Sequence, residues 1–237
     1  MATQPSLAEK LGYHSDAKLL IIHADDLGLA NAVNQAAFHA FKTGSISSAS
    51  VMVPTKKFYD VVAFSKNNPQ YDIGLHLTLN SEWKNEPWGG VSDPTKISTI
   101  LTKKQHFYSS ARLTMLHADI NDIQHECQAQ IDKARQAGLN LSHLDVHMGV
   151  LFYRKDFINM YIELGRKNKI PIFLPKYFQR IKPMIKDNAY VVWVDETVLI
   201  STSKVNKNKW NAQPKDVQAI LTMATRDMGT QINMRQL

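Results

Sequence analysis

The sequence predicts an α/β fold, a distorted (β/α) barrel of mostly parallel strands. Short apolar runs typical of buried strands alternate with longer segments whose apolar residues recur at helical spacing. This alternation favours right-handed βαβ crossovers and a parallel sheet. A chain of 237 residues is long enough for one sizeable domain. We therefore expect residues 1–237 to form a single barrel domain.

Each expected element has its own signal in the chain. The first apolar run stops at Asp25, as a buried strand stops at a polar edge. Further on, Leu75 and Leu77 alternate with Gly74 and His76, which places His76 on the face opposite the aliphatic residues. The expected strands are Lys18–Ala24, Ser45–Val53, Asp72–Leu79, Leu141–Met148, Ile170–Leu174 and Tyr190–Val194. The expected helices are Asn31–Lys42, Thr55–Asn67, Asp119–Ala137, Asp156–Lys167 and Pro214–Thr225.

A long segment, residues 80–117, interrupts the alternation. It is polar and aromatic and has no clear periodicity, and connections of this length are usually functional or disordered. Trp83 and Trp88 lie within it, and we expect them either to stack on a bound sugar or to anchor the loop. The tail after Ala189 has fewer strand signals than a finished barrel needs, so the barrel is expected to be incomplete at its C-terminus.

Composition excludes several classes of protein. The single cysteine, Cys127, rules out an intrachain disulfide and a Cys-rich zinc module. The net charge of +7 is scattered along the chain, which argues against a nucleic-acid partner. No apolar stretch is long enough to span a membrane, and residues 1–10 lack the apolar core of a signal peptide. We expect a soluble protein, cytoplasmic as given, or periplasmic or secreted if a leader has been removed.

Three short segments place carboxylates or imidazoles at the ends of expected strands. Because the carboxyl ends of parallel strands meet at one end of a barrel, Asp26, His76 and His147 are expected to converge. One carboxylate and two imidazoles leave open positions on Zn²⁺ or a similar ion, as catalysis requires. Such an ion polarises a carbonyl and lowers the pKa of bound water. The three segments are His23–Asp26, Gly74–Leu77 and His143–His147.

The neighbouring residues suggest supporting roles. Asp25 is a candidate general base, and Asp145 is placed to hydrogen-bond a ligand histidine and fix its tautomer. His143 starts its strand and is expected to give structural support, whereas His23 could lie at the edge of the site. From the residues alone, simpler interpretations stay open. An Asp-Asp pair after a strand is often a turn or a helix cap, and a lone strand histidine is often structural.

Taken together, four stretches resemble the YdjC-like carbohydrate deacetylase family, from about Leu11 to Pro175. They are KLLIIHADDLG, GSISSASVMVP, DIGLHLTLNSEW and the later block QAQIDKARQAG–SHLDVHMGVLFY. The resemblance implies a (β/α) barrel, frequent dimers and removal of N-acetyl groups from amino sugars or oligosaccharides. By matching motif it implies that Asp25 is the base. The implied ligands of one divalent ion, with zinc expected first and Mg²⁺, Co²⁺ or Ni²⁺ as alternatives, are Asp26, His76 and His147.

The chain departs from this family in one respect. Relatives usually carry a late His-Pro segment whose histidine protonates the leaving amine, but the nine histidines of this chain end at His147. Three interpretations stay open: a truncated chain, another group acting as the acid, or a protein that binds sugar without turnover. The alternative functions are therefore a non-catalytic carbohydrate-binding paralogue and a metal hydrolase of non-sugar amides or esters.

Overall fold

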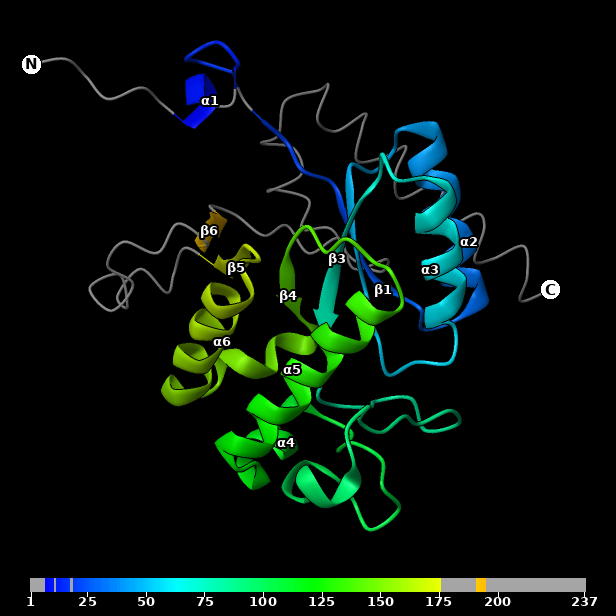
Figure 1. Ribbon diagram of the computed structural model, residues 1–237, viewed down its shortest axis with the longest axis vertical. Helices are drawn as coiled ribbons and strands as arrows, with labels where there is room; N and C mark the ends of the chain where they lie inside the picture. Colours follow the sequence, from blue (N-terminus) through cyan, green and yellow to red (C-terminus); the bar gives the residue numbers. More distant parts are fainter. Residues whose placement is uncertain (1–6, 11, 18, 176–190, 195–237) are drawn as a thin grey trace, which may run out of the picture.

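Six parallel strands, hydrogen-bonded in chain order, form the sheet (Figure 1). The computed structural model describes residues 7–10, 12–17, 19–175 and 191–194. This strand order arises when every βαβ crossover runs in the same direction, as in (β/α) barrels, and the predicted α/β class is confirmed. The strands are β1 (His23–Leu27), β2 (Ser48–Val51), β3 (Asp72–Leu77), β4 (Leu144–Val146), β5 (Ile172–Pro175) and β6 (Val191–Val194).

Helices connect and cover the strands. Helix α2 contacts β1, α5 contacts β3 and α6 contacts β5, while α2 and α3 lie side by side (Figure 1). The α-helices are α1 (Leu7–Lys10), α2 (Asn31–Thr43), α3 (Phe58–Asn67), α4 (Ala111–His117), α5 (Ile120–Gln136) and α6 (Lys155–Asn168). The 3₁₀ helices are η1 (Pro94–Lys96), η2 (Ser98–Ile100) and η3 (His147–Phe152).

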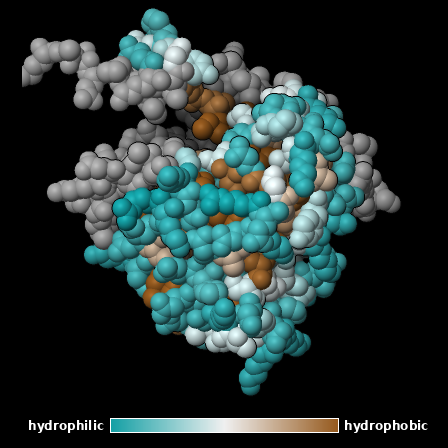
Figure 2. Space-filling view, viewed as in Figure 1, coloured by the Kyte–Doolittle hydropathy of each residue, from teal (hydrophilic) through white to brown (hydrophobic). Residues whose placement is uncertain are grey.

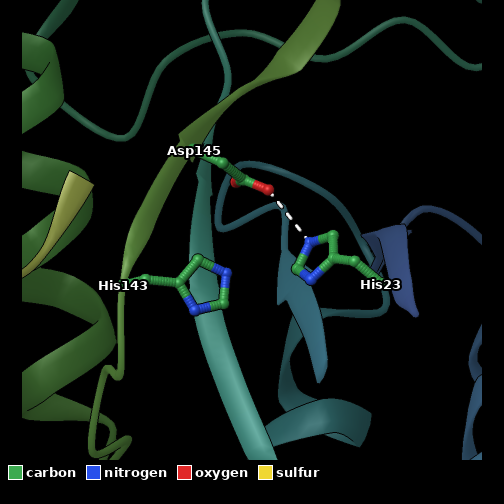
Figure 3. A group of neighbouring side chains, drawn as sticks. All are labelled: His23, His143 and Asp145. Atoms are coloured by element: carbon green, nitrogen blue, oxygen red, sulfur yellow. Dashed lines mark hydrogen bonds and ion pairs between the residues drawn. The ribbon is translucent and has the colours of Figure 1, made fainter. Parts of the chain in front are cut away.

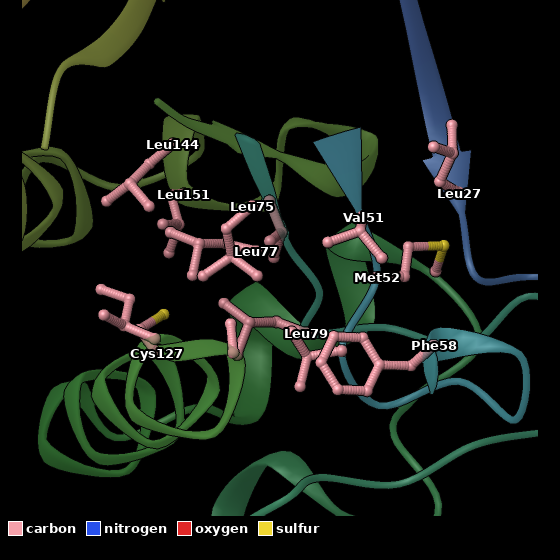
Figure 4. Close-up of a cluster of buried hydrophobic side chains, with 14 of the residues drawn as sticks. Leu27, Val51, Met52, Phe58, Leu75, Leu77, Leu79, Cys127, Leu144 and Leu151 are labelled. Atoms are coloured by element: carbon pink, nitrogen blue, oxygen red, sulfur yellow. The ribbon is translucent and has the colours of Figure 1, made fainter. Parts of the chain in front are cut away.

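The apolar core lies between the sheet and the helices (Figure 4). Leu75 and Leu77 of β3 point into this core, whereas His76 points to the opposite face and contacts Asp145. Cys127 of α5 is fully buried in the same cluster, as its helical spacing predicts. The period of two along β3 therefore gives the sheet an apolar face toward the helices and a polar face on the other side.

Several element bounds differ from those predicted. Strand β1 begins at His23, where its pairing with β2 starts, and it extends past the acidic pair because Leu27 pairs with Val51. Strand β4 ends at Val146, before the sharp turn that follows. The segment 80–117 contains η1, η2 and α4 although it shows no periodicity. The helix predicted for Pro214–Thr225 lies outside the described residues.

The surface drawn in Figure 2 is mostly hydrophilic. Hydrophobic side chains emerge on the segment that leads into β1, where Leu19, Leu20 and Ile21 are exposed. Among the described residues, every helix is too short or too polar to cross a membrane.

Candidate metal centre

The polar face of the sheet is assembled from neighbouring strands in register. His76 of β3 is paired with Asp145 of β4, and Ser50 of β2 is paired with Gly74 of β3. Asp145 accepts a hydrogen bond of 2.8 Å from the Ser50 hydroxyl. Because side chains alternate along each strand, these polar groups all lie on the face turned away from the helices.

A β-bulge near the end of β1 turns Asp26 toward this face. The register between β1 and β2 shifts between Ala24 and Leu27. Asp26, within the shift, has a φ of 67°, in the left-handed region that aspartate tolerates better than most residues. Bulges beside active sites re-aim side chains in this way. Here the bulge brings Oδ1 of Asp26 to 3.4 Å from Nε2 of His76.

His147 reaches the same point from the end of β4. It is the first residue of η3, and the next two residues, Met148 and Gly149, have φ values of 53° and 63°. This left-handed turn leaves Nδ1 of His147 at 3.2 Å from Oδ1 of Asp26. The structure thus brings together Asp26, His76 and His147, which we call the outer triad. One candidate ligand atom from each lies within 4.8 Å of the others.

The outer triad has the donor atoms, and a carboxylate oxygen without a hydrogen bond, that a divalent cation would need. Oδ1 of Asp26 is buried and accepts no hydrogen bond, although two imidazole nitrogens face it. Burial by itself raises the pKa of Asp26, but His147 and His76 outweigh burial and hold that pKa well below its usual range. One carboxylate oxygen and two imidazole nitrogens suit Zn²⁺ and similar ions. These residues can therefore hold a metal ion.

The far nitrogen of His76 is bound to a second carboxylate. Nδ1 of His76 lies 2.8 Å from Oδ1 of Asp145, and both side chains are buried. Burial lowers the pKa of His76, but Asp145 and Asp26 outweigh it and raise that pKa well above its ordinary value in the metal-free protein. When Asp145 accepts a hydrogen bond from the Nδ1–H of a neutral His76 ring, the Nε2 lone pair is left for a cation. Asp145 therefore lies where it could orient His76, and this role stays a prediction.

The far nitrogen of His147 also meets a carboxylate, which the sequence did not reveal. Nε2 of His147 lies 3.0 Å from Oε2 of Glu82. Burial lowers the pKa of His147, but Asp26 and Glu82 outweigh burial and raise it. Glu82 lies in the stretch DIGLHLTLNSEW, six positions after His76, but beyond the strand and without a periodic pattern. The only sequence signal for Glu82 was its place in a stretch that carries the family resemblance.

A second group of two histidines and one aspartate lies nearer the start of the strands (Figure 3). We call His23, His143 and Asp145 the inner triad. Nε2 of His23 lies 3.0 Å from Oδ2 of Asp145. Burial lowers the pKa of His23, but Asp145 and Asp25 outweigh burial and raise it to about 9. His23 therefore carries a proton at neutral pH and forms an ion pair with Asp145.

His143 is packed rather than hydrogen-bonded through Nε2. Its ring stacks on Phe173 with a centroid distance of 4.5 Å, and its edge faces His23. Nε2 is buried and has no hydrogen-bond partner, and burial lowers the pKa of His143. A β-carbon on Gly74 would overlap this ring, so only glycine leaves room for it at this position.

Asp25 lies between the two triads. One of its oxygens is 3.2 Å from Nε2 of His23, two residues earlier on the same strand. Its side chain is 45% exposed, so the carboxylate remains open to a bound molecule. Together with His76 and Asp145, Asp25 also forms a third group whose atoms could share a cation.

The two tryptophans of the 80–117 segment differ in exposure. Trp88 is buried and its indole nitrogen donates a hydrogen bond of 3.0 Å to the carbonyl of Asn80. Its ring lies at an edge-to-face angle to His147, with a centroid distance of 6.3 Å. Trp83, next to Glu82, is 40% exposed. Trp88 therefore anchors the segment, while Trp83 offers an open aromatic face; sugar binding by either stays a prediction.

Comparison with known proteins finds relatives named carbohydrate deacetylase. The protein from Thermoanaerobacter pseudethanolicus is 28% identical over 155 residues, which are 65% of this chain and 59% of that protein. The protein from Oceanobacillus iheyensis is 25% identical over 175 residues, which are 74% of this chain and 70% of that protein. The chain thus spans about six-tenths to seven-tenths of the length of these relatives.

A solved structure shares the fold. A protein from Enterococcus faecalis V583, provisionally named a cellobiose-phosphate cleavage protein, superposes with a TM-score of 0.66 at 23% identity. The match covers 77% of this chain and 70% of that chain. The sequence profile of the family described as YdjC-like protein matches residues 19–234, nearly the full length of the chain. The chain therefore belongs to the YdjC-like family.

Proposed function

We propose that this protein is a metal-dependent carbohydrate deacetylase that removes N-acetyl groups from amino sugars or their oligosaccharides. The observation that carries the proposal is the outer triad, in which a buried carboxylate oxygen without a hydrogen bond faces two imidazole nitrogens. The names of the relatives supply the substrate class. Zinc is the first ion to test, because two nitrogens and one oxygen leave open positions on it.

In this proposal Asp26, His76 and His147 hold the ion, and Asp25 moves the proton. When bound, a divalent ion polarises the acetamide carbonyl and lowers the pKa of a coordinated water. Asp25, half exposed beside the triad, accepts a proton from the attacking water. The leaving amine needs a proton in return. In this proposal, protonated Asp25 returns the proton to the amine nitrogen.

Acetate release tests this function. Purified protein loaded with Zn²⁺ is incubated with N-acetylglucosamine and its short oligomers, and free acetate is measured together with the mass of the sugar product. We expect a loss of one acetyl group per reaction. Asp25→Asn should lower the rate about 10²–10⁴-fold, because it removes the acid–base group, while the metal content remains equal to that of the wild type.

Other outcomes separate the alternatives. Oligosaccharide binding without acetate release would favour a non-catalytic carbohydrate-binding protein, an alternative supported by the lack of a histidine after His147. Hydrolysis of simple esters or non-sugar amides, with amino sugars left intact, would favour a different metal hydrolase. Full activity in Asp25→Asn would overturn the role given to this carboxylate.

A further inference from the structure

His147 is oriented by carboxylates at both of its ring nitrogens. Nδ1 lies 3.2 Å from Asp26 and Nε2 lies 3.0 Å from Glu82, while the side chain is only 4% exposed. A neutral imidazole carries its single proton on one nitrogen, and a hydrogen bond selects which one. The carboxylate of Glu82 can accept a hydrogen bond from Nε2–H, which leaves the Nδ1 lone pair for a cation held beside Asp26.

Glu82 is held in place by its own loop. The side-chain amide of Asn80 donates a hydrogen bond of 3.3 Å to Oε2 of Glu82. The Asn80 carbonyl in turn accepts the indole N–H of Trp88 at 3.0 Å. The Ser81 hydroxyl accepts a hydrogen bond of 3.0 Å from the Trp88 amide. The backbone immediately before Glu82 therefore has little freedom, and its carboxylate is preorganised beside His147.

Buried polar side chains of α5 form hydrogen bonds with the backbone of the same loop. Gln130 accepts a hydrogen bond from the Thr78 amide at 3.0 Å and donates one to the Thr78 carbonyl at 2.7 Å. Glu126 accepts hydrogen bonds from the amides of Val91 and Ser92 at 2.9 and 3.0 Å. Both α5 side chains are fully buried, where such bonds are costly to break. Helix α5 therefore holds the loop by hydrogen bonds both before and after Glu82 in the chain.

Glu82 contacts His147 as Asp145 contacts His76, but through the other ring nitrogen. There Nδ1 faces the orienting carboxylate and Nε2 faces Asp26. Accepting a hydrogen bond from the far N–H of a ligand histidine fixes its tautomer and raises its basicity as a ligand. We propose that Glu82 is a positioning residue for His147, so that the ion is held by Nδ1 of His147 and Nε2 of His76. This inference rests on the metal site of the proposed function.

Metal affinity measured by calorimetry tests the proposal without any need for activity. Glu82→Gln keeps the size of the side chain but removes its charge, and we expect Zn²⁺ affinity to fall about 10–100-fold. Glu86→Gln is the matched control, because Glu86 lies in the same loop, is 56% exposed and faces only the side chain of Lys56 among the contacts seen, at 3.7 Å. This control removes the same charge without touching a histidine and should leave affinity unchanged.

A tautomer measurement separates orientation of His147 from simple anchoring of the loop. Long-range ¹H–¹⁵N spectra of the zinc-loaded wild type should show His147 protonated at Nε2 and His76 protonated at Nδ1. Glu82→Asp, whose carboxylate is shorter but still an acceptor, should recover part of the affinity lost in Glu82→Gln. A role limited to anchoring predicts a lower melting temperature in Glu82→Gln with unchanged zinc affinity.

The outcomes distinguish this inference from the proposed function. Wild type that binds zinc, with equal affinities in Glu82→Gln and Glu86→Gln, would overturn the role of Glu82 and leave the metal site intact. A zinc-loaded His147 protonated at Nδ1 would overturn it as well. A wild-type protein that binds no divalent ion would remove the metal site itself, and the proposed function with it.

Discussion

The outer and inner triads contain the same residue types but differ in how their carboxylates are hydrogen-bonded. Each has two histidines and one aspartate, with ligand atoms close enough to share an ion. In the outer triad, Oδ1 of Asp26 has no hydrogen-bond donor. In the inner triad, Asp145 is bonded by His76, Ser50 and His23 at 2.8, 2.8 and 3.0 Å. The bonding of the carboxylate, and not the residue count, separates the two triads, because Nε2 of His143 in the inner triad also has no hydrogen-bond partner.

The two triads are also linked. Asp145 belongs to the inner triad, where His23 already supplies a positive charge, and at the same time it orients His76 of the outer triad. The carboxylate of Asp145 is satisfied by three hydrogen bonds, whereas Oδ1 of Asp26 accepts none. We therefore expect the inner triad to act as a fixed support and the outer triad alone to take up an ion.

Substituting one member of each triad should give the largest contrast. Asp26→Asn suits the left-handed backbone at this position but removes the anionic ligand, and we expect zinc affinity to fall by more than about 100-fold, beyond the range typical of orienting residues. His143→Asn in the inner triad should retain one zinc per chain. Metal content by mass spectrometry and affinity by calorimetry measure both. Two ions in the wild type, with one lost in His143→Asn, would contradict the assignment.

Asp145→Asn tests the link between the triads. It leaves the donors of His76, Ser50 and His23 without their anionic acceptor, and breaking a buried ion pair of this kind costs about 3–5 kcal/mol of unfolding free energy. Zinc affinity should fall about 10–100-fold, because His76 loses the group that orients it. Glu163→Gln, which removes an exposed pair with Arg166, is the control and should change neither quantity appreciably.

The cost of Asp145→Asn should depend on pH. The pKa of His23 is raised from 6.5 to about 9, so its contribution to stability is fully present below pH 6.5 and is lost as the pH rises through 9. The difference in unfolding free energy between the metal-free wild type and Asp145→Asn should therefore narrow between pH 6.5 and 9. Urea unfolding at several pH values measures this difference. A constant difference would show that neither His23 nor His76, whose pKa Asp145 also raises, loses a proton in this range.

Strand periodicity was enough to predict that His76 and Asp145 lie on the same face of the sheet. A period of two in β3 puts His76 on the polar face, and parallel strands bring Asp145 beside it. Strand periodicity could not predict the backbone features that orient the candidate ligands. The bulge at Asp26 and the left-handed turn at Met148 are backbone features without a sequence marker such as glycine at the strained residue itself.

The long-range hydrogen bonds could not be predicted from the sequence either. Glu82 lies in a loop without periodicity, and nothing local indicates that it faces His147. Glu126 and Gln130 lie on the buried face of α5, where helical periodicity favours apolar residues. They are buried because the loop supplies backbone partners for them, and such pairing depends on the tertiary structure alone.

The smallest effect that we predict concerns packing inside the inner triad. Gly74→Ala would place a methyl group against the ring of His143, which cannot move away freely because Phe173 stacks on it. Overpacking of this kind costs about 1–3 kcal/mol of unfolding free energy. His143→Ala removes the ring, so Gly74→Ala should cost much less in that background, and urea unfolding of the four proteins measures the coupling. If zinc affinity falls together with stability in Gly74→Ala, the outer triad depends on inner packing as well as on Asp145. If stability alone falls, the packing of His143 does not affect the outer triad, and the inner triad serves the metal centre by holding Asp145 in place.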